Sequence, residues 1–305
     1  MAEAEVGGDR TTATLAPPGP ALSDSGRGSR RKWLVIGAIV AVFALVIAYL
    51  LVGASVAAAS AGRADKALTA TVGHQKTVTG ALNASPFNGI DLKSQTVDVT
   101  AMKASLAKID AQVPEAESLV KSDQAALAEA RPGLGSALTL PEQGILNRDR
   151  QRVDAAVAAL KSAQTALNYD KQQDAFLHPF FDSIAALEGL TKSEQANDLP
   201  GALSQIAAAD ASLQKALALA KPPAISAQIL DLVKELQAIV ADLKGLLTAA
   251  QAHDLAGVQK WTAAGDADSK KLEAFDQTAA DNADKALFQP LNDSYNSHMK
   301  VAAGN

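Results

Sequence analysis

Residues 33–52 read WLVIGAIVAVFALVIAYLLV, a run of 20 mostly aliphatic residues that contains no charge. The hydrocarbon core of a bilayer, about 30 Å thick, is crossed by a helix of about 20 such residues. The uncharged stretch continues as far as Ala61. The sequence therefore predicts one transmembrane helix, within an anchor at residues 31–62, and makes the lipid bilayer the first expected partner.

Basic residues are denser before this span than after it. They are Arg27, Arg30, Arg31 and Lys32 on the amino-terminal side, and Arg63 and Lys66, offset by Asp65, on the other. The end of a span with more lysine and arginine stays in the cytoplasm. We therefore expect a single-pass protein of the plasma membrane, with its amino terminus in the cytoplasm and its carboxyl terminus outside.

Residues 1–30, the expected cytoplasmic tail, are rich in Gly, Ser, Thr, Pro and Ala and show no apolar period. A segment of this composition cannot bury a core, so we expect the tail to be disordered. A tail of this length is also too short for a folded output domain.

A cleaved signal peptide is the alternative to a retained anchor, because Ala59-Ser60-Ala61 matches a small-residue cleavage pattern. The apolar region of a signal peptide, however, is only about 7–15 residues long. We favour a signal anchor that is retained, and the sequence leaves open whether it is ever cleaved after Ala61.

Small residues recur on one face of the expected span. They are Gly37, Ala41, Ala44 and Ala48, at spacings of four, three and four. Such a face lets two membrane helices approach closely, which would give a homodimer. An alanine-rich helix also produces this pattern by chance, and we favour that interpretation.

The remaining chain, residues 63–305, has the apolar period of long packed helices. One seam repeats at alternating spacings of three and four: Val99, Met102, Leu106, Ile109, Val113, Ala116 and Val120. No segment alternates apolar and polar residues between turn signals, as strands do. We therefore expect an all-α domain outside the membrane, a bundle or array of long antiparallel helices with coiled-coil-like seams.

Helix breaks and differences in period divide this domain further. Pro114 is expected to kink or restart the first helix, because proline lacks the amide that bonds the preceding turn. In the next helix the apolar period weakens over Tyr169–Asp174. The strongest period of all lies in Ile225–Leu247, so we expect that helix to be the most buried.

The sequence also contains an internal duplication. Residues 187–215 align without gaps on residues 243–271 at an offset of 56, with identical pairs that include Gly189/Gly245, Gln195/Gln251, Asp198/Asp254 and Gly201/Gly257. Each copy has the pattern of a helical hairpin, in which Asp198 or Asp254 caps the second helix. A weaker match at an offset of 111 links residues 175–184 with residues 286–295. Together they predict a helical repeat whose units stack on their neighbours.

Several kinds of chemistry are not expected. The chain has no cysteine, and its four histidines are scattered, so neither a metal site nor another cofactor is predicted. Its 28 basic and 33 acidic residues are interspersed, unlike the basic face that binds nucleic acid. No nucleophile motif or isolated carboxylate pair stands out, so we do not expect an enzyme.

These features favour a non-catalytic scaffold or protein-interaction module of the cell envelope, anchored in the membrane and bound to an unknown protein partner outside it. The alternative is a sensor that binds a small ligand outside the membrane and signals through a separate cytoplasmic partner. Its best candidate pocket residues are the one aromatic cluster of the domain and a neighbouring histidine: Phe176, His178, Phe180 and Phe181. Ordinary core packing is the simpler explanation of these aromatic residues.

Overall fold

The computed structural model describes residues 27–84, 98–136, 139 and 142–304, with the backbone alone for residues 27–40 and Ile145. These residues form seven α-helices, one 3-10 helix and no strand. The helices are α1 (Arg27–Leu82), α2 (Val99–Ala130), α3 (Gln143–Gln195), α4 (Leu199–Leu219), α5 (Ala227–Gln251), α6 (Leu255–Glu273) and α7 (Gln277–Ala303), and the 3-10 helix η1 (Arg131–Gly135) follows α2. The prediction of an all-α protein is confirmed.

The chain divides into two units, residues 1–52 and 53–305. Among the described residues, α1 is the one helix long and apolar enough to cross a membrane, and the qualifying stretch begins at Ala41. Its large side chains are open to the surroundings: Phe43 and Leu45 are 66% and 70% exposed. Such exposure suits lipid better than water, since every apolar side chain left in water loses the free energy of burial.

Two predictions about the first unit fall partly outside the described residues. Of the predicted tail, residues 1–26 lie outside them, and residues 27–30 belong to α1. Of the predicted dimer face, Gly37 lies outside the residues whose side chains are described. Ala41, Ala44 and Ala48 are exposed, and the homodimer stays a prediction.

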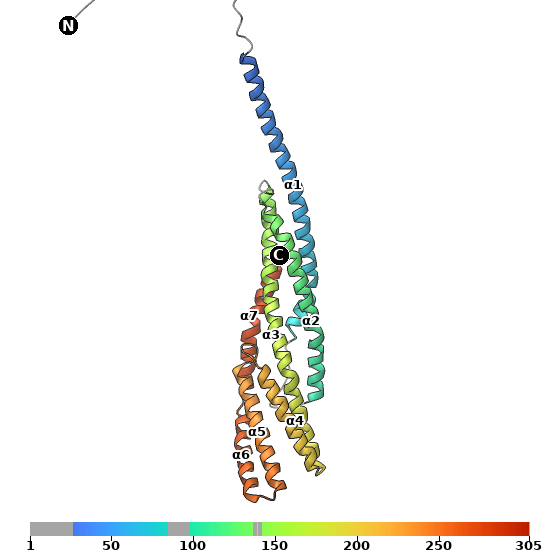
Figure 1. The fold of residues 1–305 in the computed structure, drawn as a ribbon, viewed down its shortest axis with the longest axis vertical. Coiled ribbons are helices and arrows are strands. Elements are labelled where there is room, and N and C mark those ends of the chain that lie inside the picture. Colours follow the sequence, from blue (N-terminus) through green and yellow to red (C-terminus); the bar gives the residue numbers. More distant parts are fainter. Residues whose placement is uncertain (1–26, 85–97, 137–138, 140–141, 305) are drawn as a thin grey trace, which may run out of the picture. The chain divides into compact units, whose positions relative to one another are not determined.

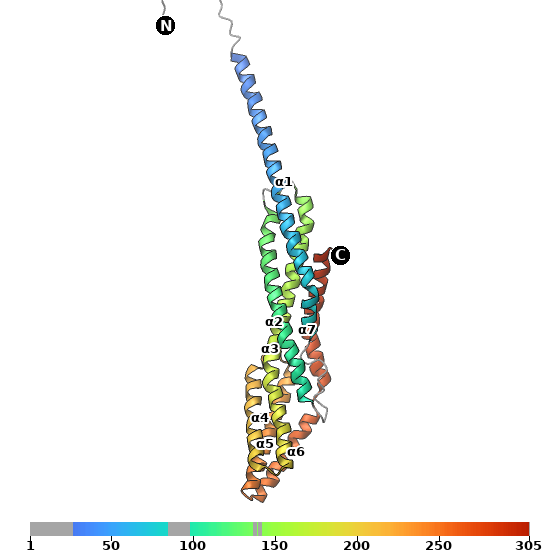
Figure 2. The same cartoon turned by 90° about the vertical axis from the view of Figure 1, so that its right-hand side faces the viewer.

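In the second unit, α3 is the central helix, and α2, α4 and α7 pack along it (Figures 1 and 2). Contacts between α3 and α7 show that these helices are antiparallel. The partners are Arg152 with Ala302, Ser162 with Ser294, and Gln173 with Asp284, so the numbers rise on one helix as they fall on the other. Helix α4 returns along the second half of α3, and α5 and α6 form a further hairpin.

Two apolar cores lie along α3. The first combines the part of α1 after Ala57 with α2, the first half of α3 and the end of α7. The second combines the later half of α3 with α4 and α5. Val153, Leu160 and Leu167 face the first core, and Phe176, Phe180 and Leu190 face the second. Both sets follow the helical period, so one long helix supports two cores.

Helix α3 continues through the segment in which its apolar period weakens. It runs unbroken for 53 residues through the segment Tyr169–Asp174, where the apolar period weakens. Helix α2 likewise continues through Pro114 without restarting, and it ends at Ala130, before Arg131-Pro132-Gly133 as expected. Neighbouring helices stabilise these helices along their whole length, which offsets the local cost of a proline.

The prediction that the helix over Ile225–Leu247 is the most buried was wrong. In α5, Leu232, Val233 and Val240 are buried, but Leu236 and Leu243 are only half-buried. The reason lies in its neighbour: α6, which packs on α5, has no buried residue at all. The apolar stripe of α5 is therefore only partly covered within the chain, and α3 is the more buried helix.

Candidate functional site

A buried polar layer separates the two cores at the middle of α3. Asp170 and Gln173 lie one turn apart on this helix and are only 2% and 1% exposed. They fall in the segment Tyr169–Asp174 whose weak apolar period was noted in the sequence. The interruption of that period marks side chains that are buried but polar. Buried polar groups cost free energy unless they find partners, so this layer requires a physical explanation.

Asp170 is held in its neutral form by its surroundings. Burial raises the pKa of its carboxyl group to about 8, and the negative charges of Asp284 and Asp174 add to the effect. Its Oδ2 atom is buried and has no hydrogen-bond partner among the described residues. The neighbouring Lys171 does not neutralise it, because the Lys171 ammonium pairs with Glu117 at 3.0 Å. The carboxyl group therefore keeps its proton near neutral pH.

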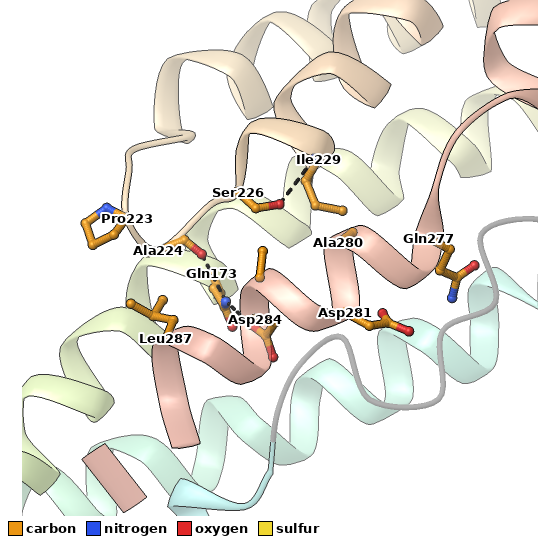
Figure 3. A pocket seen from close by; sticks show the side chains of 11 residues that line it. Gln173, Pro223, Ala224, Ser226, Ile229, Gln277, Ala280, Asp281, Asp284 and Leu287 are labelled. Atoms are coloured by element: carbon orange, nitrogen blue, oxygen red, sulfur yellow. Dashed lines mark hydrogen bonds between the residues drawn. The ribbon is translucent and has the colours of Figure 1, made fainter. Parts of the chain in front are cut away.

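Gln173 connects α3 to two other elements. Its Nε2 donates hydrogen bonds to the carbonyl oxygen of Ala224, at 3.0 Å, and to Asp284 Oδ1 on α7, at 2.7 Å (Figure 3). These two acceptors fix the orientation of the amide. Its Oε1 is buried without a partner among the described residues. A cavity of about 30 Å³ borders Gln173 and Asp284 here.

A second acidic group lies on the α2 side of the layer. Burial raises the pKa of Asp174 to about 7, as do a hydrogen bond with Asp110 and the charge of Asp110, whereas His178 lowers it. His178 Nε2 is 3.2 Å from the Asp110 carboxylate. One potential ligand atom from each of Asp110, Asp174 and His178 lies within 4.8 Å of the other two. Asp110 and His178 are exposed, so this group stays in contact with solvent.

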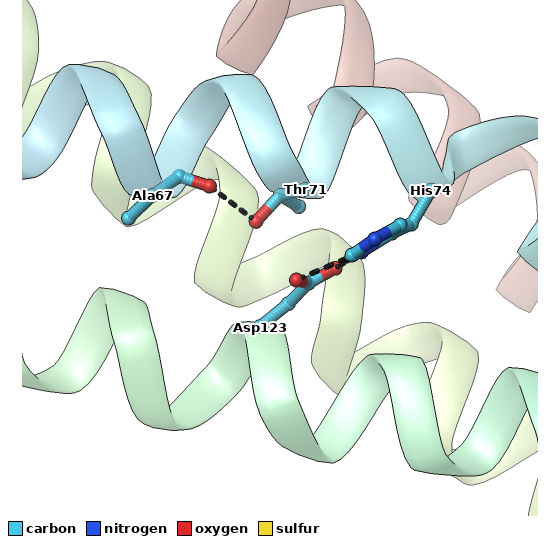
Figure 4. A network of polar contacts seen from close by, with 4 residues as sticks. All are labelled: Ala67, Thr71, His74 and Asp123. Carbon is cyan, nitrogen blue, oxygen red and sulfur yellow. Dashed lines mark hydrogen bonds and ion pairs between the residues drawn. The ribbon is translucent and has the colours of Figure 1, made fainter.

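A separate polar contact ties α1 to α2. His74 Nδ1 lies 3.0 Å from both carboxylate oxygens of Asp123, which is buried in the first core (Figure 4). Burial raises the pKa of Asp123, while the hydrogen bond and the charge of His74 lower it. Thr71, one turn before His74, donates to the carbonyl of Ala67. This is a satisfied structural pair, which links the helix that follows the candidate membrane span to the domain.

Among the described residues, the four that were predicted to line a ligand pocket separate into a buried aromatic group and an exposed histidine. Phe176, Phe180 and Phe181 are at most 2% exposed and belong to the second core, where Phe176 stacks on Phe180. His178, on the same helix, is exposed and turns towards Asp110. The rings pack as core side chains, and an open hollow of about 440 Å³ beside His178 does not include them.

Asp198 and Asp254 lie at the starts of α4 and α6. Asp198 Oδ1 accepts a hydrogen bond from the Gly201 amide, and Asp254 Oδ1 accepts one from the Gly257 amide, each at 3.0 Å. The residue before each aspartate has a positive φ, 52° at Asn197 and 54° at His253. The amide of each aspartate donates to the carbonyl five residues earlier, at 2.9 Å in both turns. The two turns thus have the same conformation.

The residues of the polar layer were not singled out from the sequence. Asp170, Gln173 and Asp284 are ordinary choices for a solvent-facing side of a helix, and Asp284 is 111 positions from Gln173. The weak period over Tyr169–Asp174 was the one available signal, because a helix that stays buried while its pattern turns polar has to bury polar groups. No protein-family model, curated protein or solved structure matches this chain.

Proposed function

We propose that this protein is a membrane-anchored, non-catalytic scaffold or interaction module of the cell envelope. Its amino terminus lies in the cytoplasm, and the helical domain, residues 63–305, lies outside. The density of basic residues before the span supports this orientation. The segment after the span supports direct anchorage, because Ala64, Leu68 and Val78 of α1 are buried in the first core. Helix α1 thus contains both the candidate span and part of the first core.

The observation that carries the proposed interaction role is the incomplete burial of the α5–α6 hairpin. Helix α6 has no buried residue, and Leu255 at its start is 78% exposed. Half of the apolar stripe of α5 is only partly covered, and an open hollow of about 440 Å³ lies beside Trp261. Leu255, together with the half-buried apolar stripe of α5, leaves apolar surface on this hairpin that favours association with another protein.

We further propose that the α3–α4 and α5–α6 hairpins are duplicated copies. The matching turns support this, and so does a second correspondence. Gly189 faces Gln205 across the first hairpin, and Gly245 faces Trp261 across the second, again 56 residues apart. In both, the glycine leaves room for a large side chain of the return helix. The two hairpin tips also lie at the same end of the second unit (Figures 1 and 2), as expected of stacked repeats.

Exchange of the tips tests the duplication. If residues 193–201 and 249–257 are equivalent, exchanging the two segments should leave the melting temperature within a few degrees of the wild-type value. The two tips have equal length, so the exchange changes no helix register. A control that shifts one exchanged segment by a single residue should destabilise the domain. Equal loss of stability in both proteins would contradict the duplication.

Protease protection tests the orientation. In intact cells, added protease should digest the protein beyond residue 63 and spare a tag at the amino terminus. Permeabilised cells provide the control, because the tag should be lost there. Protection of the domain together with loss of the tag in intact cells would reverse the proposed orientation.

Crosslinking in native membranes tests the interaction role. The full-length protein should form a specific crosslinked product, which Leu255→Arg weakens without a change in melting temperature. Val301→Arg is the matched control, because Val301 is also an exposed apolar residue, 45% exposed, on α7. An unchanged product in Leu255→Arg, or equal loss in both variants, would exclude the α5–α6 hairpin as the binding surface.

The sensor alternative is less well supported by the cavities of the domain. Pockets for small organic ligands usually measure about 300–1,000 Å³. The cavity beside Gln173 measures only about 30 Å³. The hollows of about 440 Å³ beside His178 and Trp261 are open to solvent, and neither is lined by Phe176 or Phe180. A scaffold needs no such pocket, so the scaffold remains the proposed function.

A further inference from the structure

Polar side chains link α2 to α3 at three successive levels along the two helices. The two outer levels share one arrangement, a lysine ammonium within 3.0 Å of a carboxylate: Lys171 with Glu117, and Lys103 with Asp182. The middle level differs, because it combines the carboxylates of Asp110 and Asp174 with the imidazole of His178. The lysines of the outer levels are already paired with other carboxylates.

One oxygen atom of the middle level has no partner. Asp174 Oδ1 is buried, and no described residue forms a hydrogen bond with it. The Nε2 atom of His178 lies 3.8 Å from it, which is too long for a hydrogen bond. Burial raises the pKa of Asp174 to about 7, Asp110 adds to this effect, and His178 opposes it. A cation among the three side chains would both bind the unpartnered oxygen and reduce the repulsion between the carboxylates.

The spacing of the three side chains matches the size of a tetrahedral zinc site. Zn²⁺ binds imidazole nitrogen and carboxylate oxygen at about 2.0–2.2 Å, which places neighbouring ligand atoms about 3.3–3.6 Å apart. His178 Nε2 lies 3.2 Å from an Asp110 oxygen and 3.8 Å from Asp174 Oδ1. One oxygen of each aspartate lies within 4.8 Å of the other and of the imidazole nitrogen. Small rotations of these side chains would therefore complete the site.

Folding brings these ligands together from two helices. Asp174 and His178 are one turn apart on the same side of α3. Asp110 lies on α2, 68 positions before His178. The scattered histidines, from which no metal site was predicted, therefore do not exclude one, because carboxylates can supply the other protein ligands of Zn²⁺.

We propose that Asp110, Asp174 and His178 bind one Zn²⁺ ion, with a water molecule as the fourth ligand. The imidazole favours Zn²⁺ over Mg²⁺ and Ca²⁺, which prefer oxygen ligands. Three protein ligands and one water complete the coordination of Zn²⁺. The side chains of Asp110 and His178 are 38% and 52% exposed, so solvent reaches the fourth position. The ion would join α2 to α3, and this role is independent of the proposed scaffold function.

Zinc titration of the full-length protein tests this site, in phosphatidylcholine nanodiscs and without a polyhistidine tag. After removal of metal with EDTA and dialysis, ZnCl₂ is added at neutral pH in competition with a coloured chelator. One Zn²⁺ should bind per chain, and the melting temperature should rise once free zinc exceeds the dissociation constant. Zinc should slow amide hydrogen exchange in α2 around Asp110 and in α3 around Asp174. Exchange in the α5–α6 hairpin should not change.

Two variants remove a ligand each, and a third is their control. His178→Asn and Asp110→Ala should each weaken zinc binding by at least about tenfold, since even a partner outside the ligand sphere is worth about 10–100-fold. Both side chains are exposed, so both variants should fold. His253→Asn removes an exposed histidine outside the site, and asparagine tolerates the positive φ of 54° at this position. This control should bind zinc as the wild type does.

The proposal fails if about 0.1 mM free Zn²⁺ leaves the melting temperature and the hydrogen exchange of the wild type unchanged. That result would mean that protons alone offset the repulsion between Asp110 and Asp174. It also fails if His178→Asn binds zinc as tightly as His253→Asn, because the ion would then lie elsewhere. If His178→Asn does not fold, Asp110→Ala decides: wild-type affinity in that variant overturns the site.

Discussion

Replacement of Asp170 by asparagine should stabilise the protein at alkaline pH, and the gain should have a defined pH profile. Asparagine has nearly the same size but cannot ionise. In the wild type, burial and the charges of Asp284 and Asp174 raise the pKa of Asp170 to about 8. In the unfolded chain an aspartate titrates near its ordinary value of 3.8. Between these two values the folded protein holds a proton that the unfolded chain has released.

The sign of the effect follows from this difference in bound protons. A state that releases a proton more readily is favoured as the pH rises, so ionisation of the unfolded chain lowers the stability of the folded wild type between about pH 4 and pH 8. Each pH unit in this window lowers the free energy of unfolding of the wild type by about 1.4 kcal/mol. Above pH 8 both states are ionised and the difference levels off. The full displacement of the pKa from 3.8 to about 8 therefore sets a ceiling of about 6 kcal/mol on the difference in unfolding free energy.

Chemical denaturation of both proteins in EDTA, at pH values from 5 to 9, gives the test. The free energy of unfolding of Asp170→Asn minus that of the wild type should increase by about 1.4 kcal/mol per pH unit up to pH 8 and then stay constant. Groups that do not interact with Asp170 titrate alike in both proteins and cancel in the difference. Asp293→Asn, at an exposed position on α7, should give a difference that is small and flat. A flat difference for Asp170→Asn would refute the argument, because the carboxyl would then be ionised and solvated in the folded state.

Two further predictions concern the hairpins. Gly245→Ala should destabilise the α5–α6 hairpin, because an added Cβ would collide with the indole ring of Trp261. Fluorescence should then report a more exposed Trp261. In the control Gly265→Ala the added Cβ makes only an ordinary contact, so this change should be neutral or stabilise α6 by up to about 1 kcal/mol. Asp198→Ala and Asp254→Ala should each lower the free energy of unfolding, measured by urea denaturation, by about 1 kcal/mol. Clearly unequal losses would argue against equivalent caps.

The all-α fold could be predicted because its determinants are local. The seam from Val99 to Val120 repeats every three or four residues, and the helix observed there is α2. The strong signals Arg131-Pro132-Gly133 and Lys221-Pro222-Pro223 also coincide with helix ends. The weak apolar period at Tyr169–Asp174 did not decide whether one helix continues there. Tertiary packing decides it, and α3 runs through this segment.

Burial and the polar layer could not be predicted, because both depend on neighbours that are distant in sequence. Leu236 and Leu243 satisfy the same period as Leu232, yet they are only half-buried because α6 covers them poorly. Gln173 and Asp284 meet only after α7 has folded back along α3. A single sequence does not distinguish a glutamine that meets an aspartate from one that meets water.

The polar layer costs stability that an apolar layer would not. With α3 already continuous through Asp170, apolar side chains at these positions would join the two cores into one and would remove the repulsion with Asp284. A proton on Asp170 offsets part of this cost, because the neutral carboxyl group does not repel Asp284. The offset is lost as Asp170 ionises near pH 8, so the advantage of Asp170→Asn should be largest at alkaline pH.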